Sequence, residues 1–111
     1  MTVTGLVDAG VGGLTLQTTS GNLIIDAALQ TDPQTVTLIS AGTITQSASG
    51  IITTNNLTGS SVGGTTLTAA NQFDTLGGFT NVGAGGISVT DAKSSGLTVT
   101  GAETPERAIL L

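Results

Sequence analysis

The chain has 111 residues and a net charge of −5, and charged residues make up only 8% of it, against about 25% in an ordinary soluble domain. It contains no His or Cys, which excludes Ser-His-Asp and Cys-His catalysis, zinc sites built on these ligands, and disulfides. Its two cations, Lys93 and Arg107, are too few to bind a nucleic-acid backbone or an anionic membrane surface.

Short segments that alternate apolar and small polar residues recur along the chain. This period of two is typical of a β-strand with one buried face. Each segment is about four residues long, so each strand would span about 13 Å. In chain order, the expected strands are 1–5, 13–17, 35–38, 42–45, 56–59, 66–68, 86–90 and 97–101.

Clusters of Gly, Ser, Asn and Asp separate the expected strands and favour turns. They include 18–22, 47–50 and 92–96, and Asp32-Pro33 marks another turn. Two strands in each circuit of the chain would give a coil of about 20 residues. About five such coils, stacked at about 4.8 Å, would form a rod roughly 25 Å long.

Regular short strands are also compatible with an antiparallel sandwich or barrel. A sandwich core normally contains large side chains, whereas this chain has no Trp or Tyr and only Phe73 and Phe79 as aromatics. Outward Thr, Ser and Asn can form ladders between parallel strands, and the hairpin signals Asn-Gly and Asp-Gly are absent from the sequence. We therefore predict an all-β parallel solenoid formed by a single chain, with both Phe residues filling a coil interior or corner.

Residues 102–111 depart from the repeat and hold both Glu residues and the only Arg. We expect a solenoid over 1–101 and a non-repeat tail or end cap over 102–111. Thr104, Pro105 and Glu106 fit the start of a helical turn that could cover the last coil, and a frayed tail is the alternative. The first residues have no signal-peptide pattern, so export would occur as part of a larger protein.

Four segments resemble repeats of the filamentous-haemagglutinin-like family of large bacterial exoproteins and autotransporter-type adhesins. These are 42–47, 56–61, 66–73 and 76–80, and residues 14–29 are similar to another coil of that family. The resemblance implies a right-handed parallel β-helix that is secreted across the outer membrane and serves as an adhesin stalk. The secretion-signal domain of such proteins carries Asn-Pro motifs, and this chain has none. We therefore expect an extracellular or cell-surface stalk whose parent protein binds a host protein or glycan through other parts.

No residue of the sequence is expected to be catalytic or to bind a cofactor or metal, so the chain is predicted not to be an enzyme. A glycosidase needs two paired carboxylates, and nothing here joins such a pair to an aromatic platform. Residues 82–91 faintly echo the calcium-binding β-roll repeat, but Asp91 lies beyond the strand and has no second copy. Residues 8–13 are read as a glycine-rich turn, and the sequon at Asn56 as the start of a strand. The acidic residues considered are Asp8, Asp26, Asp32, Asp74, Asp91, Glu103 and Glu106.

Two alternatives to a stalk stay open at the level of the sequence. The strands at the two ends of a solenoid lack neighbours, and such edges favour pairing with another chain. The chain could therefore be a filament subunit that associates end to end. The other alternative is a β-helix that binds or processes carbohydrate, which predicts a cleft lined by acidic and aromatic side chains.

Overall fold

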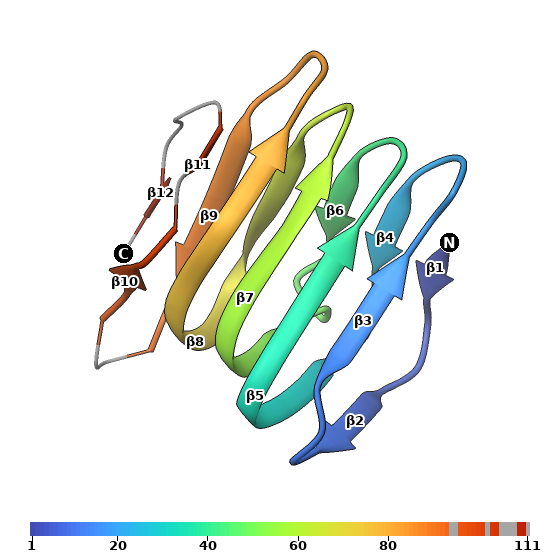
Figure 1. Ribbon diagram of the computed structural model, residues 1–111. Helices are drawn as coiled ribbons and strands as arrows, with labels where there is room; N and C mark the ends of the chain where they lie inside the picture. Colours follow the sequence, from blue (N-terminus) through green and yellow to red (C-terminus); the bar gives the residue numbers. More distant parts are fainter. Residues whose placement is uncertain (94–95, 102, 105–108, 111) are drawn as a thin grey trace.

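The structure is a computed structural model that describes residues 1–93, 96–101, 103–104 and 109–110. Twelve β-strands lie in these residues, and no helix does (Figure 1). The described residues thus contain no helix that is long and apolar enough to cross a membrane. The strands are β1 (Thr2–Val3), β2 (Val7–Gly10), β3 (Leu14–Gln17), β4 (Leu23–Ile25), β5 (Leu29–Ile39), β6 (Ile44–Gln46), β7 (Ile52–Ser61), β8 (Thr65–Asn81), β9 (Ile87–Asp91), β10 (Thr98–Val99), β11 (Glu103–Thr104) and β12 (Ile109–Leu110).

Every strand pairing in the described part of the chain is parallel. Leu14 lies beside Val36, which lies beside Leu57 of the following circuit. Paired residues are separated by between 19 positions, from Thr53 to Gln72, and 24 positions, from Phe79 to Glu103. The prediction of a parallel β-solenoid with coils of about 20 residues is therefore confirmed, and the described residues form no antiparallel hairpin.

The coils form two sheets that face each other across the interior (Figure 1). Sheet A contains β1, β4, β6, the first part of β8, β9 and β12. Sheet B contains β2, β3, β5, β7, the second part of β8, β10 and β11. Because β8 continues from one sheet into the other, the chain turns this corner without a separate loop.

One local expectation from the sequence was wrong in part and another was wrong throughout. The glycine-rich turn expected over residues 8–13 begins late: Asp8 and Gly10 belong to β2, because β5 of the next coil supplies a parallel partner, and the turn follows at Val11 and Gly12. The backbone of Asp32-Pro33 was expected to form a turn, but it lies inside β5, where the pairing with β7 shifts register between Thr31 and Thr35. A proline has no N–H to donate, so a register shift accommodates it within a strand.

Aliphatic side chains from successive coils stack into columns between the two sheets. Leu23 and Ile44 are paired neighbours in sheet A, and Val36 and Leu57 are paired neighbours in sheet B; all four are fully buried. Burying such a side chain contributes about 1.5–3 kcal/mol. The core therefore runs along the axis of the stack, and each coil adds one layer to it.

The two aromatic residues lie in this core, as the sequence predicted, and both have 0% exposure. Phe79 is in register with Gly59, which is in register with Leu38 of the coil before it. A Cβ atom at Gly59 would lie 3.0 Å from Phe79 Cζ and 2.0 Å from the Leu38 carbonyl oxygen. The missing side chain of Gly59 thus makes room for the close approach of both neighbours.

Small polar side chains line the turns that join sheet B to sheet A. Thr18, Ser40, Ser61 and Asn81 hold this position in four successive coils and are all buried. Ser40 Oγ donates to the carbonyl oxygen of Thr43 at 2.8 Å, and Ser61 Oγ contacts Asn81 Oδ1 at 3.0 Å. These bonds satisfy polar groups that a buried turn would otherwise leave unpaired.

The described residues of the expected tail pair with earlier coils. β11 lies beside the end of β8, and β12 lies beside β9. Thr104, proposed above as a helix N-cap, is part of β11, whereas Pro105 and Glu106 fall outside the described residues. The division of the chain at residue 102 stays a prediction.

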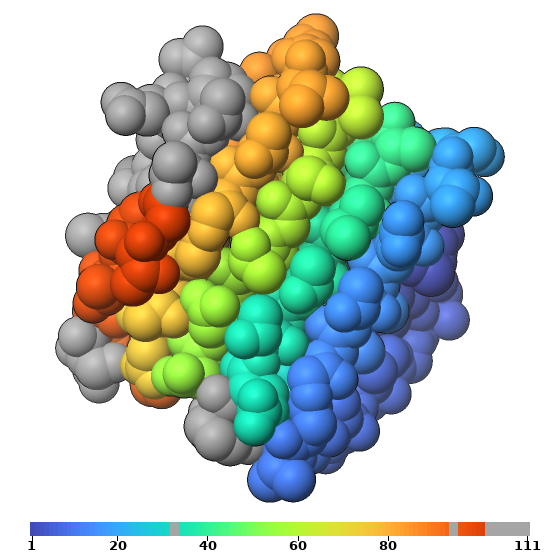
Figure 2. Space-filling view, in the orientation of Figure 1, coloured from blue at the N-terminus to red at the C-terminus, as the bar shows by residue number. Residues whose placement is uncertain are grey.

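The coils appear in the space-filling view as parallel bands that follow one another along the stack (Figure 2). The principal extents of the molecule are 31, 27 and 23 Å. The faces of these bands consist largely of outward Thr, Ser, Asn and Gln side chains, since the alternate positions are occupied by the core.

Candidate functional site

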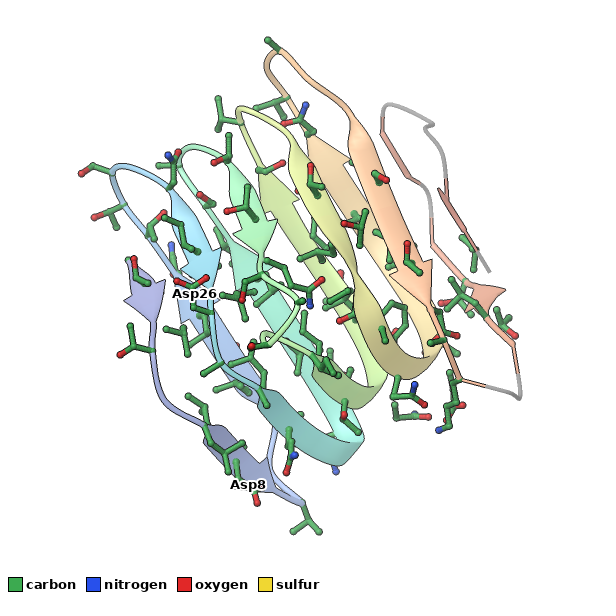
Figure 3. All side chains as sticks on the ribbon, turned by 180° about the vertical axis from the view of Figure 1, so that it is seen from behind. Asp8 and Asp26 are labelled. Carbon is green, nitrogen blue, oxygen red and sulfur yellow. The ribbon has the colours of Figure 1, made fainter. Side chains whose placement is uncertain are left out.

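The acidic side chains that the structure describes are distributed over the molecule. Asp8 on β2 and Asp26 beyond β4 are exposed and lie apart from each other (Figure 3). Asp74 forms an ion pair with Lys93 at 2.9 Å, while Asp91 is 95% buried at the end of β9. In the described part of the chain, no three His, Cys, Asp or Glu residues gather as metal ligands would.

A shallow recess of about 300 Å³ lies on sheet B between the first three coils. Asp8, Gln30 and Thr53 line it, together with Gly10 and Thr31. The first three are exact register neighbours: Asp8 pairs with Gln30, and Gln30 pairs with Thr53. We call these three residues the polar row.

Strand alternation directs the polar row outward. The residues that precede it in the chain are Val7, Leu29 and Ile52, which are themselves in register and pack in the core. Because successive side chains of a strand point to opposite faces, the polar row lies on the outer face of sheet B. The row is therefore a direct consequence of three apolar–polar pairs spaced one coil apart.

Backbone irregularities shape the rest of the recess. The pairing of β2 with β5 shifts register between Asp8 and Gly10, and Gly10 has a φ of +58°. Residues other than Gly adopt such values rarely. The hydroxyl of Thr31 donates to the carbonyl oxygen of Gly10 at 3.0 Å and also contacts that of Gly12. These bonds fix the bulge that forms one wall of the recess.

The recess presents three different hydrogen-bonding groups. Asp8 Oδ1 accepts a bond from the N–H of Gly10 at 2.8 Å, which orients the carboxylate and leaves Oδ2 for another donor. Within the described residues, neither the Gln30 carboxamide nor the Thr53 hydroxyl has a hydrogen-bond partner. The site can therefore both donate and accept hydrogen bonds.

Sequence reasoning did not identify this recess. Asp8 was considered as one of the scattered acidic residues and as part of a glycine-rich turn, and Gln30 and Thr53 were not singled out. The available signal was the recurrence of an apolar–polar pair at Val7-Asp8, Leu29-Gln30 and Ile52-Thr53. Its spacing becomes recognisable only when the coil length is known.

A second polar cluster lies at the corner where sheet A leads into sheet B. The side chains of half-buried Gln46 and buried Asn71 bond to each other there, and Asn71 is in register with Asp91, which is also buried. Asn71 Oδ1 accepts from the N–H of Ile52 at 3.0 Å, much as Asp91 Oδ1 accepts from the N–H of Phe73 at 3.2 Å. The two side chains therefore have equivalent roles in successive coils.

The second carboxylate oxygen of Asp91 distinguishes it from Asn71. Asn71 Nδ2 donates to the carbonyl oxygens of Leu67 and Thr90, at 3.2 and 3.1 Å. The equivalent atom of Asp91, Oδ2, is buried and has no hydrogen-bond partner among the described residues. A carboxylate oxygen thus occupies a position where the preceding coil has an amide donor.

We expect Asp91→Asn to raise the free energy of unfolding by about 1 kcal/mol, because an amide removes a buried group that lacks a partner. Urea unfolding monitored by circular dichroism would measure the change. Asp26→Asn is the matched control, since Asp26 is exposed and its replacement should change stability by less than about 0.5 kcal/mol. A loss of stability in Asp91→Asn would contradict the equivalence with Asn71.

Two other segments that were considered in the sequence are held by hydrogen bonds to neighbouring residues. Asn56 lies within β7, where its Nδ2 faces the Thr35 hydroxyl at 3.4 Å and its Oδ1 accepts from Thr75 at 2.8 Å. The glycine-rich segment before Asp91 forms the turn between β8 and β9, and Asn81 Nδ2 donates to the carbonyl oxygen of Ala84 in that turn at 3.0 Å. Asn56 thus bonds to the neighbouring coils, whereas the glycine-rich turn is held by a bond within its own coil.

Comparisons of the chain with protein-family models, with curated proteins and with solved structures give no match. The molecule is therefore defined by its own architecture as a parallel β-solenoid, and the resemblance to filamentous-haemagglutinin-like repeats stays an expectation from its sequence.

Proposed function

We propose that this chain is a structural segment of a bacterial secreted or cell-surface adhesin, in which it forms part of a stalk. The observation that carries the proposal is the parallel pairing of each coil with the next over the whole described length. Such pairing directs the backbone hydrogen bonds along the axis of the stack. The coils therefore form a stiff body that can be lengthened by adding further coils.

The interior and the surface both agree with a supporting role. The core is a continuous set of aliphatic columns in which each coil packs against its neighbours, so stability is shared along the rod. The surface carries small neutral polar groups and a net charge of −5, which favours solubility outside the cell. No catalytic step is assigned to the chain in this proposal.

The location of the chain on its source cells tests this function. Antibodies raised against the purified chain should label intact cells by immunogold electron microscopy, with gold particles at a distance from the envelope. Cells permeabilised before labelling provide the control for total antigen. Labelling that requires permeabilisation would overturn the proposal, as would gold confined to the cell interior.

A further inference from the structure

We propose that the recess at the polar row binds an uncharged oligosaccharide, which would give this segment a ligand of its own in addition to its role in a stalk. The site consists of Asp8, Gln30 and Thr53 at the same position in three successive coils. The ligand class follows from the groups that are present, from their spacing and from the charge around them.

The spacing of the groups favours a ligand with several hydrogen-bonding groups along its length. Neighbouring coils are about 4.8 Å apart, so the polar row offers a carboxylate, a carboxamide and a hydroxyl in a line along the axis. The row continues beyond the recess, since Thr53 is in register with Gln72. A sugar chain has hydroxyl groups that both donate and accept, which matches a row of unlike partners.

The charges of the molecule disfavour acidic sugars. Asp8 would repel a carboxylate or sulfate in the recess, and the chain as a whole has a net charge of −5. Lys93 follows β9, a strand several coils away from β2 (Figure 1), and forms an ion pair with Asp74. A purely cationic ligand would use Asp8 alone, and an exposed ion pair of this kind contributes little.

The contents of the recess also set the expected strength of binding. No aromatic residue lines it, so a sugar ring has no flat face to stack on. Hydrogen bonds to a solvent-exposed site exchange for bonds to water and add little net free energy. We therefore expect a dissociation constant of about 1–3 mM for a single chain.

Titration of the ¹⁵N-labelled full chain with neutral tetrasaccharides, cellotetraose and mannotetraose, would test the site by NMR. Saturable shifts are expected in the Gln30 side-chain amide and in the backbone amides of Gly10, Thr31 and Thr53. Tetragalacturonate and tetraglucosamine serve as the anionic and cationic comparisons. The absence of saturable shifts with both neutral sugars up to about 20 mM, a concentration well above the expected constant, would overturn the proposal. Binding of tetraglucosamine alone would overturn it as well, since Asp8 would then act as a simple cation site.

Two variants connect binding to the polar row. Gln30→Ala and Thr53→Val should each weaken binding fivefold or more, and the amide spectrum reports that each variant is folded. Gln17→Ala is the matched control, because Gln17 is also an exposed glutamine in sheet B but lies outside the recess. Equal weakening by Gln17→Ala, or no weakening by Gln30→Ala and Thr53→Val, would overturn the assignment. The outcome is independent of the stalk proposal, since a chain that binds no sugar can still label at the cell surface.

Discussion

Replacing Gly59 by alanine is expected to lower the free energy of unfolding by about 3 kcal/mol, at the upper end of the cost of overpacking a core. The added methyl group would lie 2.0 Å from the carbonyl oxygen of Leu38, a contact that no side-chain rotation relieves. The coils at this point would have to move apart, which would lengthen their backbone hydrogen bonds. Urea unfolding monitored by circular dichroism would measure the loss.

Two further variants separate the possible causes. Gly5→Ala is the matched control, because no atom lies within 4 Å of a Cβ at Gly5, and its stability should stay within about 0.5 kcal/mol. Phe79→Leu in the Gly59→Ala background should not restore stability, because the clash with the backbone of Leu38 remains. Full recovery in the double variant would show that the Phe79 ring, 3.0 Å from the added carbon, is the cause instead.

The alternation of apolar and polar residues was sufficient to predict the class of fold. In a solenoid, each strand needs only one buried face, and residues that alternate between apolar and polar give a strand such a face. The sequence could not assign each strand to a sheet, because the same alternation suits either one. Residues 1–5 and 97–101 are near-copies in sequence, yet Thr2 pairs in sheet A and Thr98 pairs in sheet B.

The position of the candidate site could not be predicted for a related reason. The recess depends on Asp8, Gln30 and Thr53 being register neighbours, and these residues are 22 and 23 positions apart. Elsewhere the separation falls to 19, as between Thr53 and Gln72. A fixed period read from the sequence would therefore misalign the row by several residues. The differences arise at register shifts and turns, where backbone geometry rather than residue type sets the length.

The buried polar corner was missed because polar residues in an alternating pattern are normally assigned to the surface. Gln46 pairs with Ile25, a core residue of the preceding coil, and thus takes a position that would otherwise be aliphatic. Its side chain bonds to Asn71 in place of a further backbone pairing between β6 and β8. A buried polar network is tolerated when its members satisfy one another, and it then favours one arrangement of the chain over its alternatives.

Asn71 is the residue on which this corner depends most, and Asn71→Ala is expected to lower the free energy of unfolding by about 3 kcal/mol. Its Oδ1 accepts from the N–H of Ile52 at 3.0 Å, and its Nδ2 donates to the carbonyl oxygens of Leu67 and Thr90. Alanine removes both atoms and leaves buried backbone groups in three successive coils without partners. Urea unfolding would measure the loss.

The matched control for this change is Asn22→Ala. Asn22 Oδ1 also accepts a backbone bond across coils, from the N–H of Thr43 at 2.9 Å, but Asn22 is exposed and water can replace it. Asn22→Ala should therefore lower the free energy of unfolding by no more than about 1 kcal/mol. Amide hydrogen exchange gives a second measurement, in which Ile52 should lose protection in Asn71→Ala and keep it in Asn22→Ala. Equal costs for the two variants would mean that burial adds nothing to the hydrogen bonds of Asn71, and that coil stacking alone holds this corner together.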